Sequence, residues 1–246
     1  MTQRPLRPLL TVTMTGALAL VLAGCGALSY GSSSVDVGPS TTEEREISDV
    51  TGVELATSGT VTIEHGDGPA LTVTAGEKVL PHLTSEVRDG VLVLGTTGGS
   101  RWGIRGPISY HLVLEELDAI SIRGSGDVHA DAASGDGLAV TVSGSGDARV
   151  QDVAVDDVAV EISGSGDVEL AGVARRQQIS ISGSGRYAGG GVSSDHALVA
   201  VRGSGGVAVD VTGTLDVVIS GSGSVTHTGG AQVTSTVVGS GSVRQG

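Results

Sequence analysis

Aromatic side chains are scarce in this 246-residue sequence, which has no phenylalanine, one tryptophan and three tyrosines. A surface that binds sugars by ring stacking therefore has few residues from which to be built. The single cysteine and six scattered histidines form no zinc-ligand motif. Lysine occurs once and no basic run exists, which argues against nucleic acid as a partner. The formal net charge of −13 favours solubility and repulsion from anionic surfaces.

A tripeptide, Gly-Ser-Gly, recurs seven times in the second half of the chain. Successive copies are separated by 18 to 20 residues. A fixed period in this range indicates one structural unit stacked on copies of itself. The first glycines of the seven copies are Gly124, Gly144, Gly164, Gly183, Gly203, Gly221 and Gly239. Glycine suits a sharp corner because it tolerates positive φ and lets neighbouring backbones approach, so we assign these residues a structural role in turns.

The residues before each glycine alternate between apolar and polar side chains. The positions four and two residues earlier are β-branched in nearly every copy, from Ile120 and Ile122 to Val217 and Ile219. This alternation predicts a short strand with one buried face. A second apolar run follows each corner, and the lack of phenylalanine fits a narrow interior. The sequence therefore predicts an all-β fold, a parallel β-helix with coils of about 18–20 residues, each holding two or three short strands.

A degenerate copy of the repeat lies upstream, where Val53 to Val61 matches Ile120 to Val128. Further strand-like segments occupy residues 71–74, 91–94 and 108–114, and residues 77–87 are a candidate short helix or cap. We therefore predict a β-helical domain over residues 45–246. Residues 45–115 form its irregular N-terminal part, and residues 116–246 form the Gly-Ser-Gly repeats.

The first 24 residues are predicted to be a signal peptide, with a basic start and a short apolar stretch. They end in Leu22-Ala23-Gly24, followed by Cys25, which resembles the bacterial lipobox and implies lipidation of that cysteine. The alternatives are an uncleaved signal anchor or ordinary secretory cleavage. Residues 25–44, rich in glycine, serine and threonine, are predicted to be a flexible tether. The expected location is the extracytoplasmic face of the cell membrane, to which the N-terminal lipid binds the protein.

Four segments of the domain carry a family resemblance. They are Val53 to Ile63, Leu71 to Leu94, Tyr110 to Leu117 and Ile120 to Asp127. Together they resemble the bacterial family called "putative auto-transporter adhesin, head GIN domain" over roughly residues 45–246. The resemblance implies a surface or periplasmic β-helical domain, often on lipoproteins, without a defined biochemical role.

Three consecutive corners carry an acid, Asp127, Asp147 and Asp167, and the next carries Arg186. Stacked coils would align the carboxylates in a column. The column is either a set of solvated polar corners, a weak cation site, or an acid/base pair. We predict no catalytic residue, no bound metal and no cofactor.

Two functional hypotheses follow. The first is a lipid-anchored module with an adhesin-like binding or structural role at the cell envelope, facing an unknown envelope or surface ligand. The alternative is a carbohydrate-active, pectinase-like β-helix enzyme, although such enzymes combine acids with aromatic platforms that are scarce here. The repeat continues to the last residues with Val237 and Val243. An open last coil would leave strand edges available, so we also predict a homo-oligomer formed through the C-terminal coil.

Overall fold

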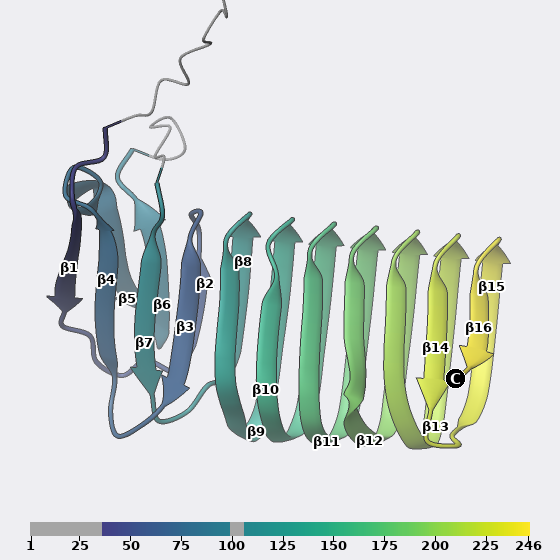
Figure 1. Ribbon diagram of the computed structural model, residues 1–246. Coiled ribbons are helices and arrows are strands. Elements are labelled where there is room, and N and C mark those ends of the chain that lie inside the picture. Colours follow the sequence, from purple (N-terminus) through teal and green to yellow (C-terminus); the bar gives the residue numbers. More distant parts are fainter. Residues whose placement is uncertain (1–35, 99–105) are drawn as a thin grey trace, which may run out of the picture. The chain divides into compact units, whose positions relative to one another are not determined.

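The computed structural model describes residues 36–98 and 106–246, which belong to one compact unit. They form a parallel β-solenoid, with coils that follow one another along a single axis (Figure 1). The predicted signal peptide, the candidate lipidation site Cys25 and most of the predicted tether lie outside the described residues. Among the described residues, no helix is long and apolar enough to cross a membrane.

The Gly-Ser-Gly repeats form the regular part of the solenoid. Five successive coils are each one long bent strand that runs from one Gly-Ser-Gly corner to the next. Each of these coils therefore holds one continuous strand instead of the two or three short strands that the sequence predicted. The five strands are β9 (Asp127–Gly144), β10 (Ala148–Gly164), β11 (Asp167–Gly183), β12 (Arg186–Gly203) and β13 (Gly206–Gly221). The shorter β8 (Ala119–Gly124) precedes them and pairs with β9.

The apolar positions of the repeat point into the solenoid. Equivalent residues pair from coil to coil, so that Val140 lies beside Val160, and Val160 beside Ile179. From Ile120 to Ile219 both apolar positions before each glycine are at most 3% exposed. Burial of a valine or isoleucine side chain contributes roughly 1.5–3 kcal/mol before the loss of conformational entropy is subtracted. The stacked columns of these side chains make up the core of the repeats.

Both glycines of the corner are required by the stacking of backbones. The first glycine has φ between +121° and +139° in all seven copies. A Cβ added to Gly164 would lie 2.2 Å from the carbonyl oxygen of Gly144 in the preceding coil. A Cβ on Gly166, the second glycine of the same corner, would lie 2.2 Å from the oxygen of Gly146. The intervening serine donates its backbone N–H to the preceding coil, as from Ser165 to Gly144 at 2.9 Å.

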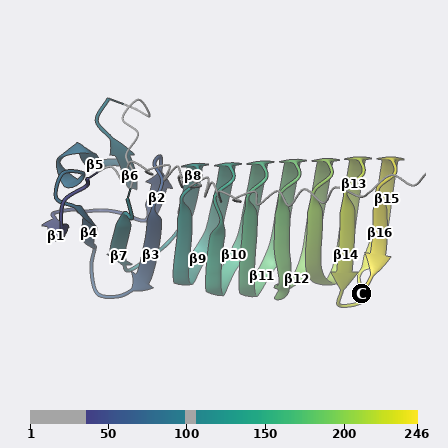
Figure 2. The same cartoon turned by 45° about the horizontal axis from the view of Figure 1, so that its top comes forward.

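The degenerate copy upstream continues the solenoid directly. Strands β2 (Gly52–Leu55) and β3 (Thr60–His65) pair in parallel with β8 and β9, so that Val53 faces Ile120 and Val61 faces Val128. On their other side lie β6 (Val91–Thr96) and β7 (Ser109–Leu114). The coil that comes later in the sequence is thus farther from the repeats, and the irregular part is stacked out of chain order (Figure 2).

Antiparallel strands close the N-terminal end. Strand β4 (Ala70–Gly76) pairs with β7 and with β1 (Ser40–Arg45), and β5 (Leu83–Arg88) pairs with β6. All of strand β1 except Arg45 lies in the range predicted as tether. Its polar sequence gives no strand signal, and pairing with β4 stabilises it. The predicted helix or cap over 77–87 is reduced to the 3₁₀ turn η1 (Leu80–His82), which contains Pro81 and leads into β5.

The C-terminal end is less covered. Strands β14 (Ser224–Thr228) and β15 (Gln232–Gly239) pair with β13, and β16 (Ser242–Gln245) pairs with β14. Val233 and Val237 occupy the same inward columns as Leu215 and Ile219. Both valines are 39% exposed, whereas Leu215 and Ile219 are fully buried. In the last described coil, apolar side chains are thus partly exposed at positions whose equivalents in the preceding coils are buried.

Candidate functional site

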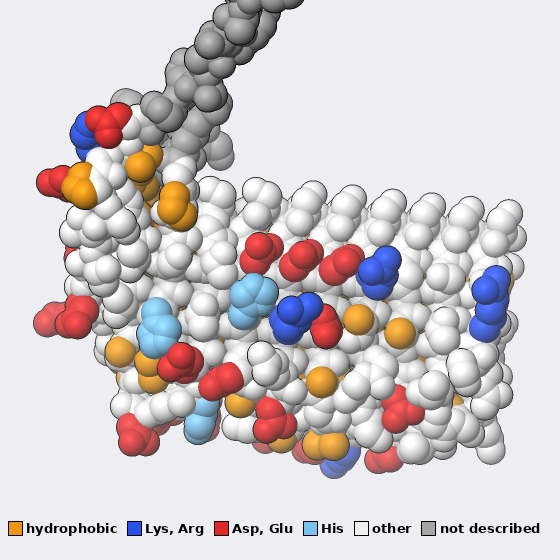
Figure 3. Space-filling view, viewed as in Figure 1, with side chains coloured by type: hydrophobic (Ala, Val, Ile, Leu, Met, Phe, Trp, Pro, Cys, Tyr) orange, Lys and Arg blue, Asp and Glu red, His pale blue; other side chains and the backbone are white. Residues whose placement is uncertain are grey.

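The predicted acidic column forms on one face of the repeats. Asp127, Asp147 and Asp167 each stand directly before the paired buried residues of β9, β10 and β11, and Asp167 pairs with Arg186. Figure 3 shows a row of acidic side chains that ends in a basic one along this face. The solenoid therefore brings together the four residues that lie about 20 positions apart in the sequence.

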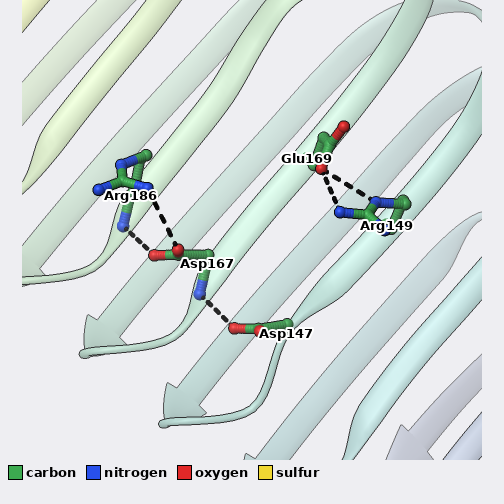
Figure 4. A network of polar contacts seen from close by, with 5 residues as sticks. All are labelled: Asp147, Arg149, Asp167, Glu169 and Arg186. Carbon is green, nitrogen blue, oxygen red and sulfur yellow. Dashed lines mark hydrogen bonds and ion pairs between the residues drawn. The ribbon is translucent and has the colours of Figure 1, made fainter.

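Each aspartate of the column binds the backbone of the next coil. Asp127 accepts a hydrogen bond from the N–H of Asp147 at 3.0 Å, and Asp147 accepts one from Asp167 at 2.9 Å. Asp167 accepts the N–H of Arg186 at 3.0 Å, with the guanidinium 3.7 Å from its second oxygen (Figure 4). In later coils glycine carbonyls take this place, as Gly185 does for Gly206. The carboxylates thus link successive coils at their corners.

A second polar column runs beside the first, two residues farther along each strand. It consists of His129, Arg149 and Glu169, and Arg149 donates to Glu169 from Nε at 2.9 Å and from Nη2 at 2.5 Å (Figure 4). Both partners are about half exposed, at 53% and 54%. An exposed pair of this kind contributes at most about 1 kcal/mol to stability. The ion pair therefore fixes the positions of these two side chains on the surface but adds little to the stability of the fold.

Together the two columns line a shallow groove of about 330 Å³. Asp167 and Glu169 each have an arginine partner, whereas Asp127 and Asp147 have none among the described residues. One end of the groove is therefore anionic, and the other balances acids with Arg186. We call the two columns together the polar face. It consists of Asp127, Asp147, Asp167 and Arg186 in the first column and His129, Arg149 and Glu169 in the second.

The described residues contain no group of three or more histidine, cysteine or acidic side chains arranged to hold a metal ion. Successive aspartates of the column are one coil apart, about 4.8 Å, and each uses an oxygen on the backbone. The weak cation site stays an untested prediction, and the hydrogen bonds supply the structural explanation for the column.

The aromatic residues of the described part lie in the interior. Tyr110 is 1% exposed and Tyr187 is fully buried. Burial raises the pKa of Tyr110 to about 12, against a smaller lowering effect of the Arg45 charge, and burial likewise raises the pKa of Tyr187. Neither ring can stack on a sugar, and Trp102 lies outside the described residues.

A larger depression, of about 910 Å³, lies at the N-terminal end, between residues 44–48, residues 69–72 and Val87. Arg45 borders it, but its guanidinium donates to the Leu83 carbonyl at 3.0 Å and the Ser85 hydroxyl at 2.8 Å. This arginine holds β1 against β5 and is not free to bind an anion.

Sequence reasoning missed a buried polar cluster made by Gln177, Tyr187 and Ser194. The signal was present in Gln177, which occupies an inward column otherwise filled by Leu138, Val158, Ala197 and Leu215. A lone amide among aliphatic residues at the same repeat position indicates a buried hydrogen-bond partner.

The chain belongs to the family described as "putative auto-transporter adhesin, head GIN domain", whose model matches residues 49–231. The fold is also that of a crystal structure from Bacteroides fragilis, described as a putative adhesin. That structure is 20% identical, with a TM-score of 0.80, and the alignment covers 84% of this chain and 97% of the other.

Two Parabacteroides structures are similar as well. One from Parabacteroides distasonis, described as a putative lipid binding protein, is 22% identical with a TM-score of 0.68, over 85% of this chain and 97% of that one. One from Parabacteroides merdae, described as a putative adhesin, is 20% identical with a TM-score of 0.67 and the same coverage. No curated protein matches the chain.

Proposed function

We propose that this protein is a lipid-anchored, adhesin-like module that presents the polar face of a rigid solenoid to a ligand at the cell envelope. The observation that carries the proposal is the contrast between inner and outer columns of the repeats. The inward columns stay aliphatic from coil to coil, whereas the polar face changes from aspartate and histidine to arginine within four coils. A scaffold that holds varied side chains at fixed spacing is suited to recognition.

The family and two of the similar structures support an adhesin-like role because they are described as adhesins. The lipobox at Cys25 supports anchoring through a lipid, which would leave the solenoid on the extracytoplasmic side. The expected partner is a component of the envelope or of a neighbouring surface. No observation favours the pectinase-like alternative, since the described carboxylates of the polar face bind backbone N–H groups or arginines.

The test is binding of the protein to isolated cell-envelope fractions. We would compare the chain carrying Cys25→Ser, to prevent lipidation, with the same chain carrying Asp127→Asn and Asp147→Asn. The amide oxygen of asparagine can still accept the coil-to-coil hydrogen bond, so the fold is retained while two charges are removed. We expect binding to fall at least fivefold.

The matched control is Glu161→Gln, which removes an exposed charge from a different face of β10. This change should leave binding unaltered. Equal binding by all three proteins would contradict the assignment of the polar face, and no binding by any of them would contradict the adhesin-like role.

A further inference from the structure

Three polar side chains are buried in the middle of the repeats and bind one another. The Tyr187 hydroxyl donates to Oε1 of Gln177 at 2.6 Å. Nε2 of Gln177 donates to the Ser194 hydroxyl at 2.9 Å and to the carbonyl of Val192 at 3.3 Å. The Ser194 hydroxyl donates in turn to the Asp210 carbonyl at 2.9 Å. The cluster thereby connects β11, β12 and β13.

The cluster lies at one of the breaks in the pairing register of the repeats, between β12 and β13. Gly189 pairs with Val209, but Ser193 already pairs with Asp210, so β12 holds three more residues than β13 across this break. The two carbonyls that the cluster binds, of Val192 and Asp210, lie at this break. The hydrogen bonds of Gln177 and Ser194 can therefore form only when β12 is stacked between β11 and β13.

The coil is also shaped to hold Tyr187. This ring occupies a column filled by valine or alanine in the neighbouring coils. A Cβ on Gly189 would approach its ring atoms to 2.3 Å. Glycine therefore leaves the space that the tyrosine fills, and a coil with another residue at this position cannot accept the ring.

Elsewhere the coils are nearly interchangeable. Their corners share Gly-Ser-Gly, and their inward columns share valine and isoleucine, so the apolar surface does little to distinguish the next coil from the one after it. If β13 stacked directly on β11, Gln177 would face Leu215 and lose both Tyr187 and Ser194. A buried amide without partners carries the full penalty of desolvation.

We propose that Gln177, Tyr187 and Ser194 act as a register lock, which prevents the coils from stacking one repeat out of place during folding. Buried polar groups that select one alignment over competing ones serve this purpose in other folds. Replacing the cluster by apolar side chains removes the penalty on misaligned stacking, while the aliphatic columns continue to hold the coils together.

Disulfide trapping reports the alignment. In the full chain carrying Cys25→Ser, which has no other cysteine, cysteines at Ser182 and Arg202 report the native pairing of β11 with β12. Cysteines at Ser182 and Ser220 are two coils apart, roughly 10 Å, which exceeds the range of about 7 Å that a disulfide spans. They can join only if β13 stacks on β11. The protein is refolded from urea under oxidising conditions, and each crosslink is quantified.

The displaced crosslink is the one between the cysteines at Ser182 and Ser220. We expect the triple variant Gln177→Leu, Tyr187→Phe, Ser194→Ala to form it at least fivefold more often than the chain with the cluster intact. The control Ile219→Val weakens the core of β13 in a different inward column, where Ile219 pairs with Val201, and should not raise the Ser182–Ser220 crosslink. An unchanged displaced crosslink, or an equal rise in the control, would overturn the proposal.

If the triple variant forms no native crosslink, Tyr187→Phe alone decides the question, because it removes one hydroxyl and keeps the ring. The lock predicts a smaller rise of the displaced crosslink, about twofold. No rise in this single variant would overturn the proposal.

Discussion

The corner glycines offer a direct test of how the coils stack. In Gly164→Ala the new Cβ meets two obstacles, a φ of +139° and the Gly144 carbonyl oxygen at 2.2 Å. The backbone strain costs about 1–3 kcal/mol. The same oxygen accepts the N–H groups of Ser165 at 2.9 Å and Gly166 at 3.2 Å. Moving the coils apart weakens both bonds, which contribute about 1 kcal/mol each.

The expected loss in the free energy of unfolding is therefore about 3–5 kcal/mol for Gly164→Ala. Gly124→Ala is the matched control, because Gly124 has a φ of +132° but no atom within 4 Å of its added Cβ. It retains the backbone strain without the clash, so its loss should be only about 1–3 kcal/mol.

Urea unfolding followed by circular dichroism of the β-sheet signal measures both variants. A difference of about 2 kcal/mol between them corresponds to a separation of roughly 1 M in the urea midpoints. Gly164→Val should be at least as damaging as Gly164→Ala, whereas Gly246→Val should leave the midpoint unchanged. Equal midpoints for Gly164→Ala and Gly124→Ala would refute the argument that stacked backbones require the corner glycines.

Three further predictions concern the anchor, the last coil and the buried tyrosines. Cys25→Ser should move the protein from the membrane to the soluble fraction, and full retention in the membrane would contradict the lipobox assignment. Because Val237 is exposed in an otherwise buried column, the Cys25→Ser chain should self-associate in sedimentation experiments. Val237→Lys should abolish the association and Thr62→Lys should not, whereas a strict monomer at high micromolar concentration contradicts the idea. The raised pKa values of Tyr110 and Tyr187 mean that the unfolded chain loses protons above pH ~10 while the folded chain keeps them. Stability should therefore fall as the pH rises from ~10 to ~12. Below pH ~11 at most one of the three tyrosines of the folded protein should contribute to tyrosinate absorbance at 295 nm, because the pKa of Tyr110 is about 12.

The solenoid could be predicted because every coil repeats the same pattern of residues, whereas the family was predicted from four segments, three of which lie upstream of the Gly-Ser-Gly repeats. A buried ladder of equivalent strands needs the same alternation of apolar residues each time, and the corners need glycine, so the sequence shows a period. The degenerate copy from Val53 to Val61 was found for the same reason, and it does face Ile120 to Val128. The acidic column also followed from the period.

The N-terminal end could not be predicted in the same way. The order in which β6 and β7 lie outside β2 and β3 depends on pairings between distant segments, and short strands carry no signal for their partner. The polar strand β1 exists because β4 offers it an edge. Arg45 binds the carbonyl of Leu83, a contact between segments 38 residues apart.

By itself the sequence determined the coil, its length, its corners and the direction of its apolar side chains, because these depend on local geometry repeated at a fixed interval. Only the tertiary structure decided what the polar groups do. It assigned the carboxylates of Asp127, Asp147 and Asp167 to the backbone of the next coil. It also joined Gln177 to Tyr187 and Ser194 inside the core. A hydrogen bond requires two groups within about 3 Å, and that proximity arises only when the coils are stacked.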